Sequence, residues 1–168
     1  MEAEARAKSD NVIQLKKNEE ILRLRIIDEE GNDTGNSLEF NLEDIELPLR
    51  YQELVEKDKL NKQQLKSQLV IIEKKQDHKG KKLFSANEEA KIKAMVEFYK
   101  KEAEVYDMFL GKDGVKKLLN GRELSWSTLA EIDEIINSAI LPKLELSGER
   151  IKEKIMSKYS TKRDDVIE

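Results

Sequence analysis

Residues 85–111 read SANEEAKIKAMVEFYKKEAEVYDMFLG. Ser85 followed by Glu88 is a capping box, in which the two side chains accept the backbone N–H groups left unpaired at a helix start. Gly111 stands where a helix commonly ends in glycine. Between these ends apolar residues recur every three or four positions, which predicts one wide apolar helix face. That face carries Ile92, Met95, Val96, Tyr99, Ala103, Tyr106, Phe109 and Leu110.

A second long helix is predicted upstream, from about Leu49 to about Gln76. Asp44 is placed to cap it, and Pro48 is tolerated only in its first turn because proline has no N–H to donate. The seam of this helix is apolar at both ends and polar in the middle, which predicts a break or a water-exposed waist near residues 57–62. The seam consists of Tyr51, Leu54, Val55, Asp58, Asn61, Leu65, Leu69 and Ile72.

A short helix is predicted just beyond Gly111. Val115, Leu118 and Leu119 lie at helical spacing. The Asn-Gly pair at positions 120–121 tolerates the left-handed backbone of a helix end and is expected to terminate this helix.

The last core helix is predicted to start at Ser125 or Ser127 and to end at Pro142, because proline cannot continue a regular helix. Beyond it, residues 147–168 are mostly charged and favour a peripheral helix followed by disorder. The apolar positions are Trp126, Leu129, Ile132, Ile135, Ile136, Ala139 and Ile140 in the core helix, then Ile151, Ile155 and Met156 in the tail.

An antiparallel β-hairpin is predicted ahead of the helices. Residues 21–28, ILRLRIID, alternate apolar and charged side chains, with Arg23 and Arg25 on the polar face. The turn-forming EEGNDTGN at 29–36 leads into SLEFNL at 37–42, which alternates again. An isolated hairpin is marginal in water, so its apolar face must pack on the helices or on a partner. The candidates for that face are Ile21, Leu22, Leu24, Ile26, Leu38, Phe40 and Leu42.

Together these elements predict a mainly α protein with a small β part, an α+β fold in which an N-terminal antiparallel hairpin precedes four to five helices, one of them long. One domain is expected. The expected parts are a flexible N-terminus at 1–10, a domain at 11–146 with a short strand at 11–16, its hairpin region at 11–43 and its helical region at 44–146, and a peripheral helix with a charged tail at 147–168.

Composition narrows the class of function. The 168 residues include 31 Lys and Arg against 35 Asp and Glu, a net charge of −4, so there is no overall cationic field to hold nucleic acid. The absence of cysteine fits a reducing compartment, and no stretch has the apolar run of a signal peptide or a membrane span. We therefore expect a cytoplasmic protein without a nucleic-acid or membrane partner.

Residue types suited to catalysis are scarce. The single histidine, His78, falls in a lysine-rich stretch, whereas a catalytic base needs a shaped and partly desolvated pocket. Carboxylate doublets such as Glu88-Glu89 do not share a helix face, and no glycine pattern matches a phosphate-binding loop. The sequence predicts no catalytic residue, no cofactor and no metal site, and hence a protein that is not an enzyme.

The stretch KKQDHKGKK at 74–82 has five lysines and could touch phosphate. It lacks the interleaved aromatic residues of a nucleic-acid surface, which favours a solvated loop. Apolar helix faces are the stronger signal, because methionine and aromatic side chains line adaptable helix-binding grooves. The candidate partner-binding residues are Met95, Tyr99, Tyr106, Phe109, Leu110, Trp126 and Ile136.

The order of segments carries a resemblance. An acidic pair, Glu43 and Asp44, precedes a helix start with Arg50 and Tyr51; a helix then ends at 109–111, Phe-Leu-Gly, and a lysine-hydrophobic-glycine turn follows at 117–121. Over about residues 37–144 the chain resembles a family of small proteins encoded in the tail gene cluster of long-tailed phages and prophages of Gram-positive bacteria.

The resemblance implies a phage tail assembly chaperone, a non-virion protein that coats the helical tape-measure protein until the tail tube polymerises around it. Many small subunits making weak contacts would cover such a partner through avidity, which also admits a homo-oligomer. Two alternatives stay open: a structural tail or baseplate component that adds its hairpin to a neighbouring sheet, and a small regulatory interaction protein.

Overall fold

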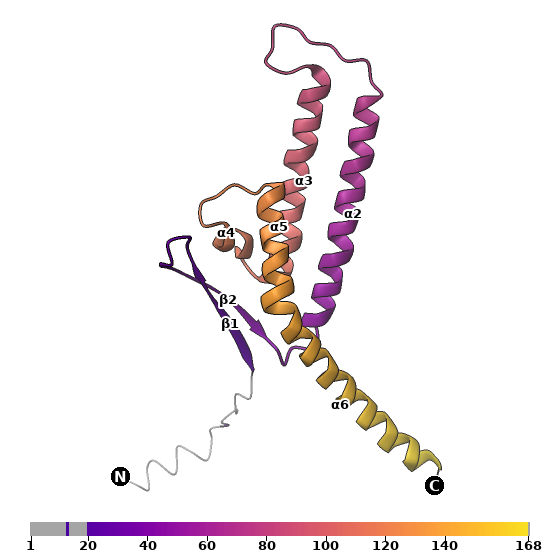
Figure 1. Cartoon of the computed structure of the whole chain (residues 1–168). Coiled ribbons are helices and arrows are strands. Elements are labelled where there is room, and N and C mark those ends of the chain that lie inside the picture. The colour runs from indigo at the N-terminus through magenta and orange to yellow at the C-terminus, as the bar shows by residue number, and fades with distance from the viewer. Residues whose placement is uncertain (1–12, 14–19, 168) are drawn as a thin grey trace.

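The computed structural model describes residue 13 and residues 20–167, with side chains described as far as Tyr159. The predicted α+β class is confirmed, because a two-stranded antiparallel hairpin stands beside a larger set of helices (Figure 1). The flexible segment expected at 1–10 lies outside the described residues, as does the strand expected at 11–16 apart from Ile13.

The hairpin pairs β1, Ile21–Ile27, with β2, Asp33–Asn41. Leu22 faces Phe40 in this register, so the apolar sets of both strands share one face, and Leu38, Phe40 and Leu42 are buried as predicted. The prediction for Ile21 is wrong, since its side chain is exposed. Strand side chains alternate between faces, which puts residue 21 on the face of the two arginines.

Helix α2 runs without interruption from Leu47 to Glu73, so the predicted waist is absent. Its polar middle faces helix α3 rather than water, as described below. Asp44 is not the cap residue either. Its carboxylate accepts the N–H of Glu46 at 2.9 Å and pairs with Arg50 at 2.7 Å, and the hydrogen bond from Arg50 lowers the pKa of Asp44. Asp44 therefore stabilises the turn that precedes helix α2.

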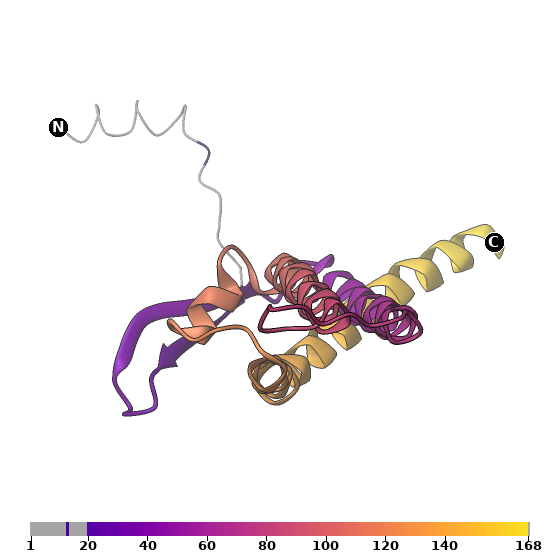
Figure 2. The ribbon, with the colours of Figure 1, turned by 90° about the horizontal axis from the view of Figure 1, so that it is seen from above.

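Helix α3, Ala86–Leu110, forms as predicted, with both hydrogen bonds of the capping box present and Gly111 at φ 98° after its last turn. The short helix α4, Gly114–Leu119, follows. It ends at Asn120 and Gly121, which have positive φ as expected for this pair. Helices α2 and α3 are antiparallel neighbours and make the most extensive helix contact of the fold (Figures 1 and 2).

The last helical rod is longer than predicted. Ser125 caps α5, Trp126–Ile135; a π-helical turn, Ile136–Ile140, follows; and α6, Leu141–Ile167, continues it. Pro142 therefore does not end the helix. A regular α-helix would clash with its ring and lose the hydrogen bond to residue 138, but the wider π turn just before it relieves that conflict. The rod changes direction here (Figure 1).

Helix α6 is tied to the base of the hairpin before it leaves the body. The buried Ser147 hydroxyl donates to the backbone carbonyl of Leu42, and Arg150 pairs with Glu20 at 2.6 Å. Helix α6 crosses the domain boundary expected at residue 146 without a break, and continues to Ile167 where disorder was expected. The reason is that the π turn keeps the rod helical through Pro142, so the tail starts from a formed helix.

Helices α2 and α3 project well beyond the rest of the molecule (Figure 1). We call their end near Leu47 and Leu110 the lower end and their end near residues 74–85 the upper end. The hairpin, α4 and α5 surround the lower part, where Phe109 lies 5.5 Å from Phe40 between ring centroids. Within the described part of the chain, no helix has the length and apolar character needed to cross a bilayer.

Two glycines test the packing of this fold. A Cβ at Gly114 would lie 2.5 Å from the Cβ of Leu110, whereas a Cβ at Gly148, within α6, would meet nothing within 4 Å. We expect Gly114→Ala to lower the free energy of unfolding by about 1–3 kcal/mol, because the α3–α4 corner must open. Gly148→Ala should raise it by about 0.5–1 kcal/mol, since alanine favours the helical state. Chemical denaturation of both variants measures this, and a destabilised Gly148→Ala protein would contradict the helical assignment.

Candidate protein-binding surface

Four of the seven candidate residues belong to the core. Tyr106, Phe109, Leu110 and Ile136 are buried, so in this fold they cannot contact a partner, and their assignment as binding residues is corrected. The reason is that the lower part of the apolar face of α3 packs on the hairpin and on α5. The sequence pattern showed the full width of the face but not how much of it neighbouring elements cover.

The other three candidates come together at the middle of the α2–α3 pair. Trp126, the first residue of α5, is 57% exposed, and Met95 and Tyr99 are half-buried. The ring of Phe98 lies 6.1 Å from that of Trp126 and 5.5 Å from that of Tyr99, and the Lys62 ammonium lies 5.7 Å from the Trp126 ring. Here α5 begins, and above it none of the other described helices covers the pair (Figure 1).

Apolar side chains continue upward from this point. Ile92 and Val96 on α3 are 43% and 46% exposed, and they extend the helical stripe that carries Tyr106 lower down. Leu69 on α2 lies two turns above Lys62, on the same side of its helix. We call this surface the upper strip. Its members are Leu69, Ile92, Met95, Val96, Tyr99 and Trp126.

Beneath the strip, a buried carboxyl cluster joins α2, α3 and α5. Glu102 on α3 is completely buried, and its Oε1 accepts a hydrogen bond from Asn61 at 2.9 Å. Its Oε2 and the Oδ1 of Asp58 have no donor while both carboxyls are ionised. The Tyr106 hydroxyl donates to Asp133 on α5, and the Lys62 ammonium donates to Asp58 at 3.0 Å.

Burial, together with a hydrogen bond to Asp58, raises the pKa of Glu102 to about 8. The raised pKa favours the protonated form of Glu102, which can donate to Asp58 and so gives both orphaned oxygens a partner. Burial and the hydrogen bond to Asp133 likewise raise the pKa of Tyr106. The hydrogen bonds of the cluster link α3 to α2 and to α5, and Glu102 at its centre is closed to solvent.

The sequence contains a signal for this cluster that becomes visible only when two helices are considered together. Glu102 stands between Phe98 and Tyr106 at four-residue spacing, within the apolar face of α3. A charged residue at such a position indicates a buried partner. The polar middle of α2, with Asp58 and Asn61, is the matching half, and it resembles a solvent-exposed waist when α2 is considered without α3 beside it.

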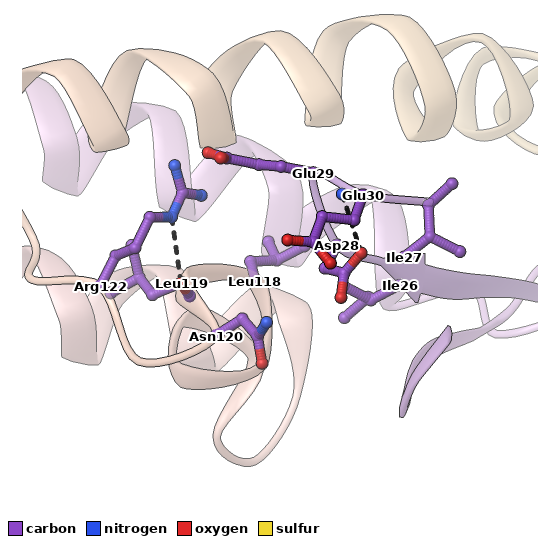
Figure 3. Close-up of a pocket in the computed structure, with 9 residues that line it drawn as sticks. All are labelled: Ile26, Ile27, Asp28, Glu29, Glu30, Leu118, Leu119, Asn120 and Arg122. Carbon is purple, nitrogen blue, oxygen red and sulfur yellow. Dashed lines mark hydrogen bonds between the residues drawn. The ribbon is translucent and has the colours of Figure 1, made fainter. Parts of the chain in front are cut away.

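A cleft of about 390 Å³ lies elsewhere, between the turn of the hairpin and the end of α4 (Figure 3). Ile26 and Leu118 supply apolar lining. Two of its charged groups are engaged locally: Asp28 accepts the N–H groups of Glu30 and Asn32, and Arg122 donates to the carbonyl of Leu119. The cleft holds no nucleophile next to a base, and the described residues contain no acidic or histidine group arranged to hold a metal ion.

A smaller cleft of about 260 Å³ follows the seam between the hairpin and α6. Ile151 and Ile155 line it beside Arg150 and Lys154. Two of the three cations that line the cleft contact the chain's own carboxylates, since Arg150 pairs with Glu20 and Lys154 lies 3.8 Å from Glu43. This cleft is a seam within the fold, whereas Ile92, Val96 and Trp126 of the upper strip leave much of their apolar surface exposed.

The carboxyl cluster predicts an unusual pH dependence. A carboxyl whose pKa is higher in the folded than in the unfolded state contributes full stability below the unfolded value, near 4.5, and loses it as the pH rises toward 8. The free energy of unfolding should therefore fall over this window by up to about 1.4 kcal/mol per pH unit. Glu102→Gln, which keeps the shape and stays neutral, should flatten the dependence and be the more stable protein at pH 8.

Urea denaturation between pH 5 and pH 8.5 measures this difference. Glu104→Gln is the matched control, because Glu104 is an exposed carboxyl on the same helix. An equal pH slope for the wild-type protein and Glu102→Gln would show that Glu102 is already ionised when buried, contrary to this account.

Comparisons with known proteins assign neither a family nor a function to this chain. No protein-family model, no curated protein and no solved structure matches the chain.

Proposed function

We propose that the protein is a non-catalytic binding protein that holds an amphipathic helix of its partner against the upper strip. One observation carries this proposal: α5 fills the position of a third helix beside the lower part of α2 and α3, and that position is open above Trp126 (Figure 1). A helix bound there would complete a three-helix bundle, with its apolar stripe on Met95, Val96 and Tyr99.

The chemistry of the strip suits a partner with a varied sequence. Methionine and aromatic side chains adapt to different apolar shapes, and the strip contains Met95, Tyr99 and Trp126 within two turns of α3 and the start of α5. One strip is short, so a single contact is expected to be weak. Several copies on a long helical partner would gain affinity through avidity.

This is the contact that a tail assembly chaperone needs. The resemblance to small tail-cluster proteins of long-tailed phages, together with the open strip, supports the proposal that the partner is the tape-measure protein and that binding occurs in the host cytoplasm during tail morphogenesis. A tape measure is long, amphipathic and prone to aggregate before assembly. Coating its apolar stripe would keep it soluble until the tube forms.

A structural tail component is the second candidate, because the described sheet has only two strands. Each strand therefore has an outer edge without a neighbouring strand, and such edges can add a strand from another subunit. Purified particles separate the two functions. A chaperone should be missing from mature tails, whereas a structural component should be present at fixed stoichiometry.

Substitutions in the strip test the binding proposal. We expect the double variant Ile92→Asp and Val96→Asp to fold, because the two side chains are 43% and 46% exposed and lie outside the buried core. It should lose about tenfold or more in affinity, because the partner would have to bury two charges. Co-expression with the tape-measure protein of the same gene cluster measures this as co-purification and as the soluble fraction of the tape measure.

Two further variants sharpen the result. Leu60→Asp is the matched control, since Leu60 is 55% exposed and has no place in the strip. Ile71→Asp probes a groove of about 350 Å³ that Ile71, Ile72 and Ala94 line between the same two helices. Loss of co-purification with Ile71→Asp but not with the strip variant would reject the strip as the binding surface. No effect of the wild-type protein on tape-measure solubility would reject the chaperone function itself.

A further inference from the structure

The loop that joins α2 to α3 lies at the upper end of the molecule, farthest from the hairpin and α6 (Figure 1). We call residues 74–84 the apical loop. Its base is fixed: the carboxylate of Asp77 accepts the N–H of Asn87 at 3.0 Å, and the side chain of Asn87 donates to the carbonyl of Lys75 at 2.9 Å. The N–H of Ala86 donates to the carbonyl of His78 at 2.8 Å. These bonds leave residues 79–84 as an outward arc.

Two adjacent apolar side chains end this arc. Leu83 is 82% exposed and Phe84 is 44% exposed. A leucine and a phenylalanine next to each other in the loop at the upper end of the α2–α3 pair form an apolar point that the fold leaves partly uncovered. A protruding apolar point of this kind can enter a soft apolar phase more easily than it can pack on a flat protein surface.

Positive charge surrounds the apolar point. Lys74, Lys75, Lys79, Lys81 and Lys82 are all exposed. The one acidic residue of the loop, Asp77, already accepts the backbone N–H groups of His78 and Asn87. The chain as a whole carries −4, so the rest of the molecule is more acidic than the total suggests. A negatively charged surface would attract the loop and repel the rest of the molecule, so the α2–α3 pair would meet the surface with its upper end.

We propose that the apical loop docks on an anionic lipid surface, with Leu83 and Phe84 in the headgroup region and the lysines at the phosphates. Clustered lysines beside a few apolar side chains have the composition that holds proteins at such surfaces. The sequence predicted no membrane partner because no segment can cross a bilayer, but a loop that inserts its tip needs no crossing helix. Nucleic acid fits less well, since the arc offers only one aromatic ring for stacking and leucine cannot stack on a base.

Vesicle sedimentation with the purified full chain tests this proposal. The protein should bind vesicles of equal parts phosphatidylglycerol and phosphatidylcholine and should not bind vesicles of phosphatidylcholine alone. Lys81→Gln with Lys82→Gln should weaken binding by about 25-fold, roughly fivefold for each lysine. Leu83→Ser with Phe84→Ser should weaken it by about tenfold or more, because the apolar insertion is lost.

Matched controls lie far from the loop. Lys152→Gln with Lys158→Gln removes two exposed charges from α6, and Leu60→Ser removes an exposed leucine from α2; neither should change vesicle binding by more than about twofold. Since the chain has no cysteine, Leu83→Cys can carry an environment-sensitive dye, with Leu60→Cys as its control. Only the dye at position 83 should shift to shorter wavelength on the anionic vesicles.

Three results would overturn the proposal. Equal binding to both vesicle types would show that charge has no part in it. Undiminished binding of Leu83→Ser with Phe84→Ser, or an unshifted dye at position 83, would show that no apolar tip inserts. Displacement of the protein from vesicles by a short single-stranded DNA at equal phosphate concentration would assign the lysines to nucleic acid instead.

Discussion

Glu102 is enclosed where water cannot solvate it, and its carboxyl finds polar partners at one place along α2, opposite Asn61 and Asp58. Leucine and phenylalanine contacts between two long helices tolerate a shift of one turn, because apolar packing has little directionality. A buried carboxyl does not tolerate it: one turn upward, Glu102 would face Leu65 and lose its hydrogen bonds. The cluster therefore fixes the register of the α2–α3 pair at some cost in stability, as buried polar residues do in coiled coils.

The rest of the fold follows from this register. It places Phe109 at the lower end of α3 against Tyr51 and against Phe40 of the hairpin, so the sheet has a surface on which to pack. It also places the Tyr106 hydroxyl where Asp133 accepts it, which holds α5 across the lower part of the pair. Because α5 starts at Trp126, in the middle of the pair, the same arrangement leaves the upper strip and the apical loop outside the core.

Local signals in the sequence determined most of the elements. The capping box at Ser85 and the glycine at 111 marked both ends of α3, and the alternation in 37–42 identified the buried face of β2, because each signal depends on residues a few positions apart. The expectation that Pro142 ends the helix is wrong for the opposite reason. The helix continues through Pro142 because a π turn precedes it, and no local sequence pattern predicts that turn. Four of the seven candidate binding residues are buried because long-range packing decides burial, and periodicity identifies an apolar face but not the element that covers it.

The upper strip and the apical loop both belong to the projecting α2–α3 pair but depend on different physical interactions. Binding at the upper strip buries apolar area, which salt does not screen, whereas the apical loop acts through exposed lysines whose field falls off over about 8 Å at physiological ionic strength. Raising the salt concentration should therefore release the loop from an anionic surface while a helix on the strip stays bound. The two surfaces also lie one beyond the other along the α2–α3 pair. A partner on the upper strip would lie alongside α3, and the apical loop above it would remain free to contact a surface (Figure 1). The α2–α3 pair can thus hold a partner helix on the upper strip and present the charged apical loop at the same time, because neither contact uses the side chains of the other.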